Sequence, residues 1–150
     1  MLVLLLGCAA PAAPEEQHRG YATVQAGSAR THEWDRSASW MEARGGWVFL
    51  PSGVAAADLG LGWGQSGEGF ISLTAGLELR PWPRARLSPF LRGEVGLFGE
   101  PEYSGYVAGL GGGLALRLGS RWSLRAGAAW NAHGGATGPV TYYGGLQVRF

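Results

Sequence analysis

The feature that most constrains the fold of this chain is a strict alternation of apolar and polar residues over its last segment, residues 140–150. Successive side chains of a β-strand point to opposite faces, so a period of two predicts a sheet with two different environments. One parity carries Val140, Tyr142, Gly144, Leu146, Val148 and Phe150, and the other carries Thr141, Tyr143, Gly145, Gln147 and Arg149.

The same period recurs along the chain from residue 21 onward. It predicts eight strands of roughly nine to thirteen residues, about the length that a tilted strand needs to cross a bilayer. The strands are expected within residues 21–27, 41–49, 55–63, 71–80, 87–97, 106–118, 121–131 and 140–150.

Turn-forming residues separate these segments. Three connectors, 50–53, 81–86 and 119–120, are short and rich in Pro, Gly or Ser. The connectors that alternate with them, 29–39, 64–69, 99–105 and 132–139, are predicted to be longer. Short turns at one end and longer loops at the other are typical of the periplasmic and extracellular ends of a bacterial barrel. An even number of strands brings both termini to the same end, here predicted to be periplasmic.

The polar parity carries charged side chains in most of the predicted strands. An Arg that faces the hydrocarbon midplane costs about 2–4 kcal/mol, so this parity is predicted to face the lumen. An eight-stranded barrel is just wide enough for side chains to fill it, and Glu78, Arg92, Glu94 and Arg125 are predicted to plug it. The predicted lumen residues are Glu42, Arg44, Asp58, Glu78, Arg92, Glu94 and Arg125.

Glycines on the same parity are predicted to leave room for these long side chains. They are Gly60, Gly62, Gly109, Gly111 and Gly113. Charged residues make up 15% of the chain, whereas soluble domains usually contain about a quarter. The sequence therefore predicts an all-β fold, a closed eight-stranded antiparallel up-and-down transmembrane β-barrel over residues 21–150.

Aromatic residues fall near both ends of the predicted strands. An amphipathic ring prefers the headgroup region of a bilayer, so these residues are predicted to form two interfacial girdles. Trp63, Tyr106 and Trp130 lie next to the longer connectors, and Trp47, Phe49, Trp122 and Phe150 lie at the opposite ends. A soluble sandwich or lipocalin-like barrel also alternates, but there the apolar parity faces inward.

The apolar run at residues 1–13 is too short for a membrane helix and is interpreted as the remnant of a signal peptide, with the true start upstream or the chain truncated. Within it, Leu5-Leu6-Gly7-Cys8 is similar to a bacterial lipobox, which makes Cys8 a candidate for lipidation. The alternative is that Cys8 is a small apolar residue inside the signal peptide. Residues 14–20 are predicted to be a periplasmic lead-in. A single cysteine excludes an intrachain disulfide.

Three stretches, 88–96, 109–118 and 122–127, resemble the outer-membrane β-barrel superfamily that includes the OmpA transmembrane domain, OmpX and the opacity proteins. The end of the chain resembles the C-terminal signal that the barrel-assembly machinery binds, carried by Tyr142, Leu146, Val148 and Phe150. The resemblance implies a place in the bacterial outer membrane, with lipid and lipopolysaccharide as partners. Short predicted loops argue against an adhesive role.

The function expected from these features is that of a non-catalytic barrel with a structural or surface-interaction role. One alternative is a lipid A deacylase, which the resemblance implies would carry a nucleophilic Ser two residues after His133. Gly135 stands there instead, and Asn131, His133 and Thr137 supply no recognisable nucleophile and base. A second alternative is a small pore, although eight strands leave little open lumen.

Neither a cofactor nor a nucleic-acid partner is expected, since the sequence contains no phosphate-binding loop, cysteine pair or nucleic-acid motif. Three adjacent polar residues in the first long connector, His32, Glu33 and Asp35, could ligate a metal. Such loop residues are far more often simply hydrated, and His18 adds no matching ligand set, so no metal site is predicted.

Overall fold

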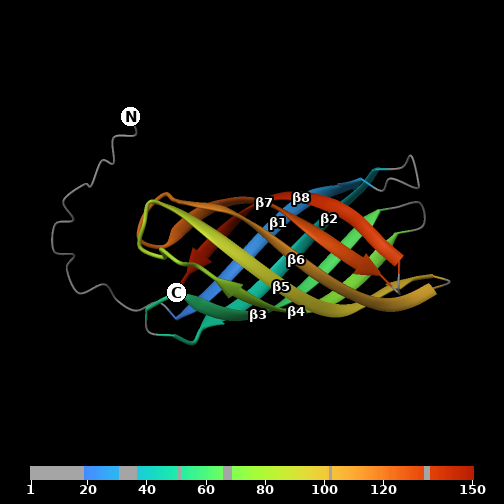
Figure 1. Cartoon of the computed structure of the whole chain (residues 1–150), viewed down its shortest axis with the longest axis horizontal. Helices are drawn as coiled ribbons and strands as arrows, with labels where there is room; N and C mark the ends of the chain where they lie inside the picture. Colours follow the sequence, from blue (N-terminus) through green and yellow to red (C-terminus); the bar gives the residue numbers. More distant parts are fainter. Residues whose placement is uncertain (1–18, 31–36, 51, 66–68, 102, 134–135) are drawn as a thin grey trace.

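A computed structural model of the chain describes residues 19–30, 37–50, 52–65, 69–101, 103–133 and 136–150. Eight antiparallel strands form a closed barrel in which each strand pairs with its neighbours in sequence and β1 pairs with β8 (Figure 1). The strands are β1 (Gly20–Arg30), β2 (Ser37–Val48), β3 (Ala55–Gln65), β4 (Phe70–Leu79), β5 (Leu87–Glu100), β6 (Tyr103–Arg117), β7 (Trp122–His133) and β8 (Ala136–Arg149). Among the described residues, no helix is long and apolar enough to cross a membrane.

The first and last strands close the barrel. Gly20 and Phe150 exchange two backbone hydrogen bonds of 3.0 Å, and the ladder continues from Tyr21 opposite Arg149 to Arg30 opposite Val140. The Phe150 ring lies over Gly20, where a Cβ atom would stand 2.6 Å from Phe150 Cε2. Closure leaves no strand of this sheet with an unpaired edge, and it places both ends of the barrel chain at the same rim.

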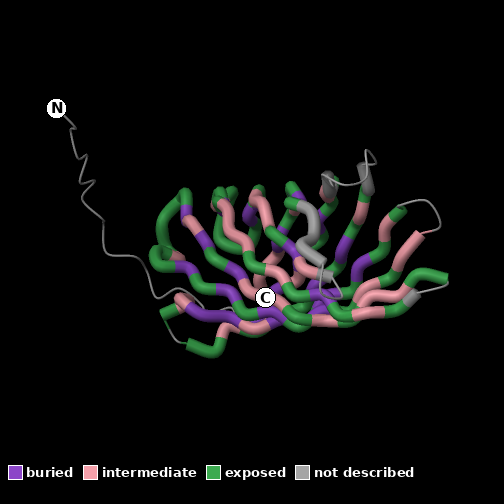
Figure 2. The backbone as a smooth tube through the Cα atoms, turned by 45° about the vertical axis from the view of Figure 1, so that its right-hand side comes forward, coloured by how far each residue is buried: buried purple, intermediate pink, exposed green. Residues whose placement is uncertain are grey.

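Burial follows the alternation of the sequence, with buried and exposed residues following one another along each strand (Figure 2). The outward parity exposes large apolar side chains, among them Leu59 at 64% and Leu110 at 66%. The inward parity buries polar ones, including Thr23, Glu78 and Gln147. The predicted fold class is confirmed, and the large side chains of the apolar parity point away from the axis rather than into a dry core.

Strand ends are where the sequence prediction was wrong. β5 continues to Glu100 and β6 begins at Tyr103, so most of the predicted loop 99–105 is paired strand. β7 and β8 likewise extend into the predicted loop 132–139. A register shift lies between Trp130 and Ala132, where Trp130 opposes Val140 and Ala132 opposes Thr137. This bulge takes the Gly-Pro step at 138–139 out of the ladder, which suits a Pro that has no N–H to donate.

The predicted contrast in connector length is also wrong. Residues 101–102 and 134–135 make two of the connections at the end far from the termini, whereas 80–86 connects β4 to β5 at the near end. Gly99 and Gly105, which bounded one predicted loop, lie inside paired strands instead. Connector length therefore does not distinguish the two ends of this barrel.

Candidate functional site

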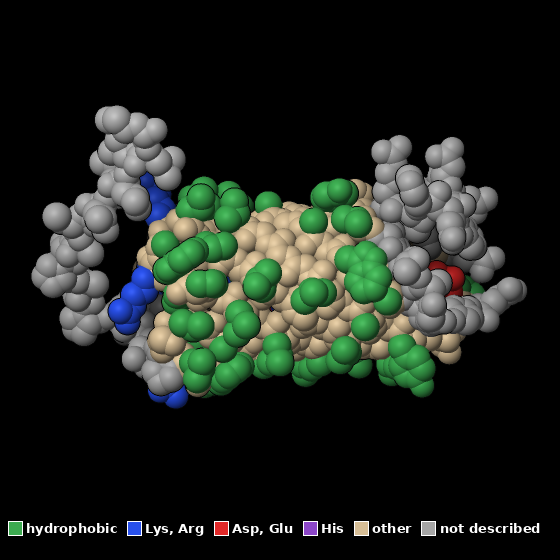
Figure 3. All heavy atoms as spheres, in the orientation of Figure 1, with side chains coloured by type: hydrophobic (Ala, Val, Ile, Leu, Met, Phe, Trp, Pro, Cys, Tyr) green, Lys and Arg blue, Asp and Glu red, His purple; other side chains and the backbone are tan. Residues whose placement is uncertain are grey.

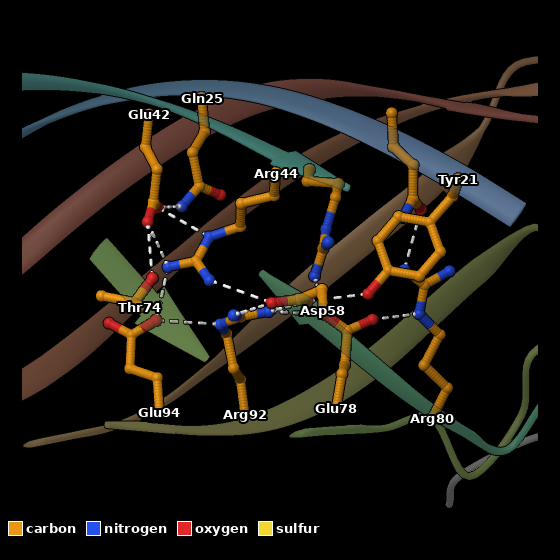
Figure 4. Close-up of polar contacts among 12 residues, drawn as sticks. Tyr21, Gln25, Glu42, Arg44, Asp58, Thr74, Glu78, Arg80, Arg92 and Glu94 are labelled. Carbon is orange, nitrogen blue, oxygen red and sulfur yellow. Dashed lines mark hydrogen bonds and ion pairs between the residues drawn. The ribbon is translucent and has the colours of Figure 1, made fainter. Parts of the chain in front are cut away.

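The centre of the lumen is organised around Asp58 on β3 (Figure 4). Arg92 on β5 donates two hydrogen bonds of 2.5 Å to it, one to each carboxylate oxygen, and Arg44 on β2 donates a third of 3.1 Å. The Tyr21 hydroxyl donates another, at 2.7 Å. Glu94 joins the same two guanidinium groups, since its Oε2 accepts from Arg44 and, at 3.2 Å, from Arg92 Nε. Fork-to-fork pairing of this kind is the strongest form of side-chain hydrogen bond.

On one side of this centre, Glu42 is held by four donor groups. Arg44 contacts both of its carboxylate oxygens, at 2.7 Å from Nε and 2.6 Å from Nη2. The Gln25 amide donates at 2.6 Å and the Thr74 hydroxyl at 3.1 Å. A buried carboxylate needs hydrogen-bond donors in place of the water that it loses, and both oxygens of Glu42 accept hydrogen bonds from these groups.

On the other side of the centre, Glu78 is held by arginines. Arg80 Nε donates to it at 2.5 Å, Arg125 donates to its second oxygen, and Arg92 lies 3.9 Å from that oxygen. Arg80 also donates to the Gln147 side chain at 2.8 Å. Glu78 is 1% exposed, so these guanidinium groups take the place of water around it.

The carboxylates and guanidinium groups of this cluster balance one for one, which keeps the interior neutral as a whole. They come from β2, β3, β5 and β7 and from β4 with the residue that follows it, so the ion pairs cross the lumen as well as follow the wall (Figure 4). Pairing of this kind offsets the cost of removing the charges from water. We call this cluster the lumen network: Glu42, Arg44, Asp58, Glu78, Arg80, Arg92, Glu94 and Arg125.

All the charged residues predicted for the lumen lie in this network, and ion pairs join them, with the 3.9 Å contact between Arg92 and Glu78 connecting the pair Glu78–Arg125 to the others. The sequence prediction omitted Arg80, which has the parity of Glu78 but directly precedes Pro81, at the expected end of a strand. It also omitted the neutral members that complete the hydrogen bonding. These are Tyr21, Gln25, Thr74 and Gln147, all on the polar parity.

Glycines lie opposite the long charged residues in the strand register. Gly60 faces Arg44, and its Cβ would lie 2.5 Å from Glu42 Oε1. Gly76 faces both Asp58 and Glu94, and its Cβ would run into the Arg92 guanidinium, 2.8 Å from Cζ. The missing side chains therefore make the space that the network occupies.

Other glycines of this parity have a different role from the one predicted. A Cβ on Gly111 would lie 2.6 Å from the Ala128 carbonyl oxygen, and one on Gly113 would lie 2.7 Å from Gly127 Cα. These two residues allow close approach to the backbone of β7 rather than room for an arginine. Gly62 and Gly109 do border side chains, those of Ser72 and Asn131 respectively.

A valine at position 76 is expected to lower the free energy of unfolding by about 1–3 kcal/mol, because it must displace the Arg92 guanidinium from a filled interior. Urea unfolding followed by tryptophan fluorescence measures the loss. The matched control is Gly93→Val, because Gly93 points outward and nothing lies within 4 Å of its Cβ position. Equal stability of the two variants would contradict this account of Gly76.

A small apolar layer fills the lumen beside the network. Phe90, Ala115 and Tyr143 form a buried cluster, against which Trp40 packs. The Arg125 guanidinium lies 4.2 Å from the centre of the Phe90 ring and so links this layer to the ionic one. Side chains thus occupy the axis in both layers.

Of the residues weighed for catalysis, Asn131 donates its amide to the Thr141 hydroxyl at 3.0 Å, which holds it against β8. His133 is the last residue of β7, and Gly135 lies outside the described residues. Cys8, His18, His32, Glu33 and Asp35 also lie outside them. Within the described ranges, no group of three His, Cys, Asp or Glu residues could hold a metal ion.

Hydrophobic side chains cover much of the visible outer wall (Figure 3), and the aromatic residues noted in the sequence are exposed on the outside of the barrel. The rings near the far end and those near the termini are all exposed, in two groups at opposite ends of the strands. The exposed rings are Trp63, Tyr106, Trp130, Trp47, Phe49, Trp122 and Phe150. Tyr142, Leu146 and Phe150 of the C-terminal pattern are exposed on this wall, and Val148 shares their parity with partial exposure.

An apolar exterior around a charged, side-chain-filled interior defines the chain as a small closed barrel of the transmembrane type. No protein-family model matches the sequence. No curated protein matches it either.

Solved structures do match. Neisserial surface protein A aligns with a TM-score of 0.69 and 12% identity, over 87% of this chain and 97% of that one. The N-terminal β-barrel domain of Pseudomonas aeruginosa OprF aligns with a TM-score of 0.65, 14% identity, and coverage of 87% and 97%. The attachment invasion locus protein Ail of Yersinia pestis gives 0.54, 13%, and coverage of 88% and 99%. The chain has the eight-stranded barrel fold of these surface and outer-membrane proteins, and the expected resemblance is confirmed at the level of fold.

Proposed function

We propose that this chain is a non-catalytic outer-membrane β-barrel with a structural or surface-interaction role. The observation that carries the proposal is the inverted distribution of its side chains. Leu59, Val95 and Leu110 are each more than 60% exposed on the outer wall, while the charged side chains of the lumen network are paired inside. Exposing so much apolar surface to water has an unfavourable free energy, whereas contact with the acyl chains of a lipid bilayer does not.

The filled lumen supports a structural role over transport. The lumen network and the Phe90 layer occupy the axis, so the pore alternative has no observation in its favour. For the deacylase alternative, the sequence offers Gly135 where a nucleophile is needed. The surface that could meet a partner is then the far rim of the barrel and its wall, with lipid and lipopolysaccharide as the surrounding molecules.

We further propose that the termini lie on the periplasmic side. Gly20 and Phe150 meet at one rim, so an exported N-terminus and a C-terminal assembly signal would be delivered to the same compartment. The exposed parity of Tyr142, Leu146 and Phe150 offers the barrel-assembly machinery a contact surface before β8 closes the sheet. Lipidation of Cys8 stays a prediction for the exported chain.

Fractionation of a bacterium that expresses the chain tests the proposal. We expect the protein in the outer-membrane fraction, released by detergent but not by salt. On a gel, the unheated protein should migrate differently from the boiled protein, because a closed barrel resists unfolding in detergent. Recovery in the soluble fraction without detergent, with one mobility before and after boiling, would overturn the assignment.

A further inference from the structure

The rim that holds the termini is strongly basic. Arg19, Arg84, Arg86 and Arg121 are exposed there, before β1 and in the connectors 80–86 and 118–121. We call these four residues the arginine collar. Figure 3 shows arginine side chains gathered at this end of the visible face, and none along its apolar middle. None of these four arginines belongs to the lumen network.

Backbone hydrogen bonds fix three members of the collar to the barrel wall. The carbonyl of Arg19 accepts from Val48 N at 2.8 Å, that of Arg86 from Arg117 N at 2.8 Å, and that of Arg121 from Arg149 N at 2.9 Å. These bonds belong to three different seams, β1–β2, β5–β6 and β7–β8. The guanidinium groups are therefore distributed around the perimeter from rigid attachment points.

Like charges face one another across two of these seams. Arg86 lies opposite Arg117, and Arg121 lies opposite Arg149. Of the described carboxylate side chains, those of the lumen network are bound inside, and Glu100 lies at the opposite end. None of the described carboxylate side chains therefore lies at this rim beside the four arginines of the collar.

Large apolar residues accompany the collar. Trp82 is 64% exposed in the same connector as Arg84 and Arg86, and Phe49 and Leu50 are exposed in the neighbouring one. A mixture of exposed aromatic rings and arginines is suited to the headgroup level of a bilayer, where one end of a residue is apolar and the other wet. A nucleic acid or an acidic protein would bind the arginines but would leave the exposed Trp82, Phe49 and Leu50 side chains in water.

We propose that the arginine collar binds the phosphate groups of anionic phospholipids in the leaflet at the terminal rim, and so fixes the depth of the barrel. The inference rests on the proposed function, since it requires the wall to be in a bilayer. Arginine presents a planar fork that matches phosphate oxygens, and each basic residue at an anionic surface strengthens binding.

The test uses the whole chain folded into phosphatidylcholine vesicles. Brominated phosphatidylglycerol or brominated phosphatidylcholine is mixed in, and quenching of tryptophan fluorescence gives the relative affinity for the anionic lipid. We expect a preference of roughly fivefold or more at low salt, which high salt reduces. Replacing the collar by Arg19→Gln, Arg84→Gln, Arg86→Gln and Arg121→Gln together should bring the preference to within about twofold of unity.

The same four positions changed to Lys provide the matched variant, which should keep most of the preference because its charge is retained. A glutamine variant as selective as the original chain would overturn the proposal. So would a folded original chain with no preference for phosphatidylglycerol, or one that prefers vesicles containing lipid A alone. If no heat-modifiable band forms in any vesicle, the proposed membrane function fails instead, and the gel distinguishes that outcome.

Discussion

Replacing Arg92 with Leu should cost about 3–5 kcal/mol of unfolding free energy, the range for removing one partner of a buried ion pair. Arg92 makes two 2.5 Å bonds to Asp58 and one of 3.2 Å to Glu94. Without it, the buried Asp58 carboxylate loses two of the four hydrogen bonds donated to it, and Glu94 keeps only Arg44, because the leucine side chain has no hydrogen-bond donor. Urea unfolding in phosphatidylcholine vesicles, followed by tryptophan fluorescence, gives the loss directly.

Two comparisons show whether the effect comes from the lumen network. Glu100→Leu removes an exposed charge at the far end of β5 and should change stability by about 0.5 kcal/mol or less. Adding Asp58→Asn to Arg92→Leu should recover part of the loss, because the second change removes the stranded charge. If Arg92→Leu unfolds at the same urea concentration as the original chain, the ion pairs contribute nothing to stability and the network account fails.

Replacing Leu59 with Arg should lower stability or insertion by about 2–4 kcal/mol in vesicles, the cost of an arginine on the lipid face near the midplane. Leu59 lies in the middle of β3, 64% exposed, and its cross-strand neighbours are Gly45 and Ala75. These small neighbours leave it no polar group with which a guanidinium could pair on that face. Equilibrium folding into vesicles at a series of urea concentrations measures the change.

Leu118→Arg is the matched control, since Leu118 is 56% exposed but lies beyond the end of β6. An arginine there reaches the interface and should cost about 0–1 kcal/mol. A water-soluble barrel would treat two exposed leucines alike, so equal effects of the two changes would argue against a lipid-facing wall. Both variants change an exposed leucine to arginine, so they differ mainly in how deep the new side chain lies in the bilayer.

The two faces of every strand could be predicted from the sequence because burial in a barrel has a period of two, and a misplaced charge is expensive. Glu78 and Arg92 illustrate this: both were assigned to the lumen, and both are bound there. The pairing of Arg92 with Asp58 could not be predicted, because β3 and β5 are not neighbours in the sheet. Only the cross-section of the closed barrel brings these two side chains together.

Strand ends were less predictable because glycine does not mark loops alone in this chain. It is used first as an ordinary residue of a paired strand and second to make space for a neighbouring side chain. Gly99 and Gly105 look like loop residues, yet both lie in the β5–β6 ladder, opposite Ser104 and Phe98 respectively. Gly76 and Gly60 show the second use, which is to vacate space for a neighbour's long side chain. Local sequence cannot separate these uses, since the atoms that need the space belong to other strands.

The seam between β1 and β8 joins residues that are separated by almost the whole length of the chain, from Tyr21 with Arg149 to Arg30 with Val140. Contacts so distant in sequence carry the largest cost in loop-closure entropy, so we expect them to form late in folding. Until then two rows of backbone N–H and C=O groups have no partner, and hydrocarbon supplies none. An open intermediate is therefore unstable in the lipid interior, which makes the joining of these two strands and full insertion a single cooperative event.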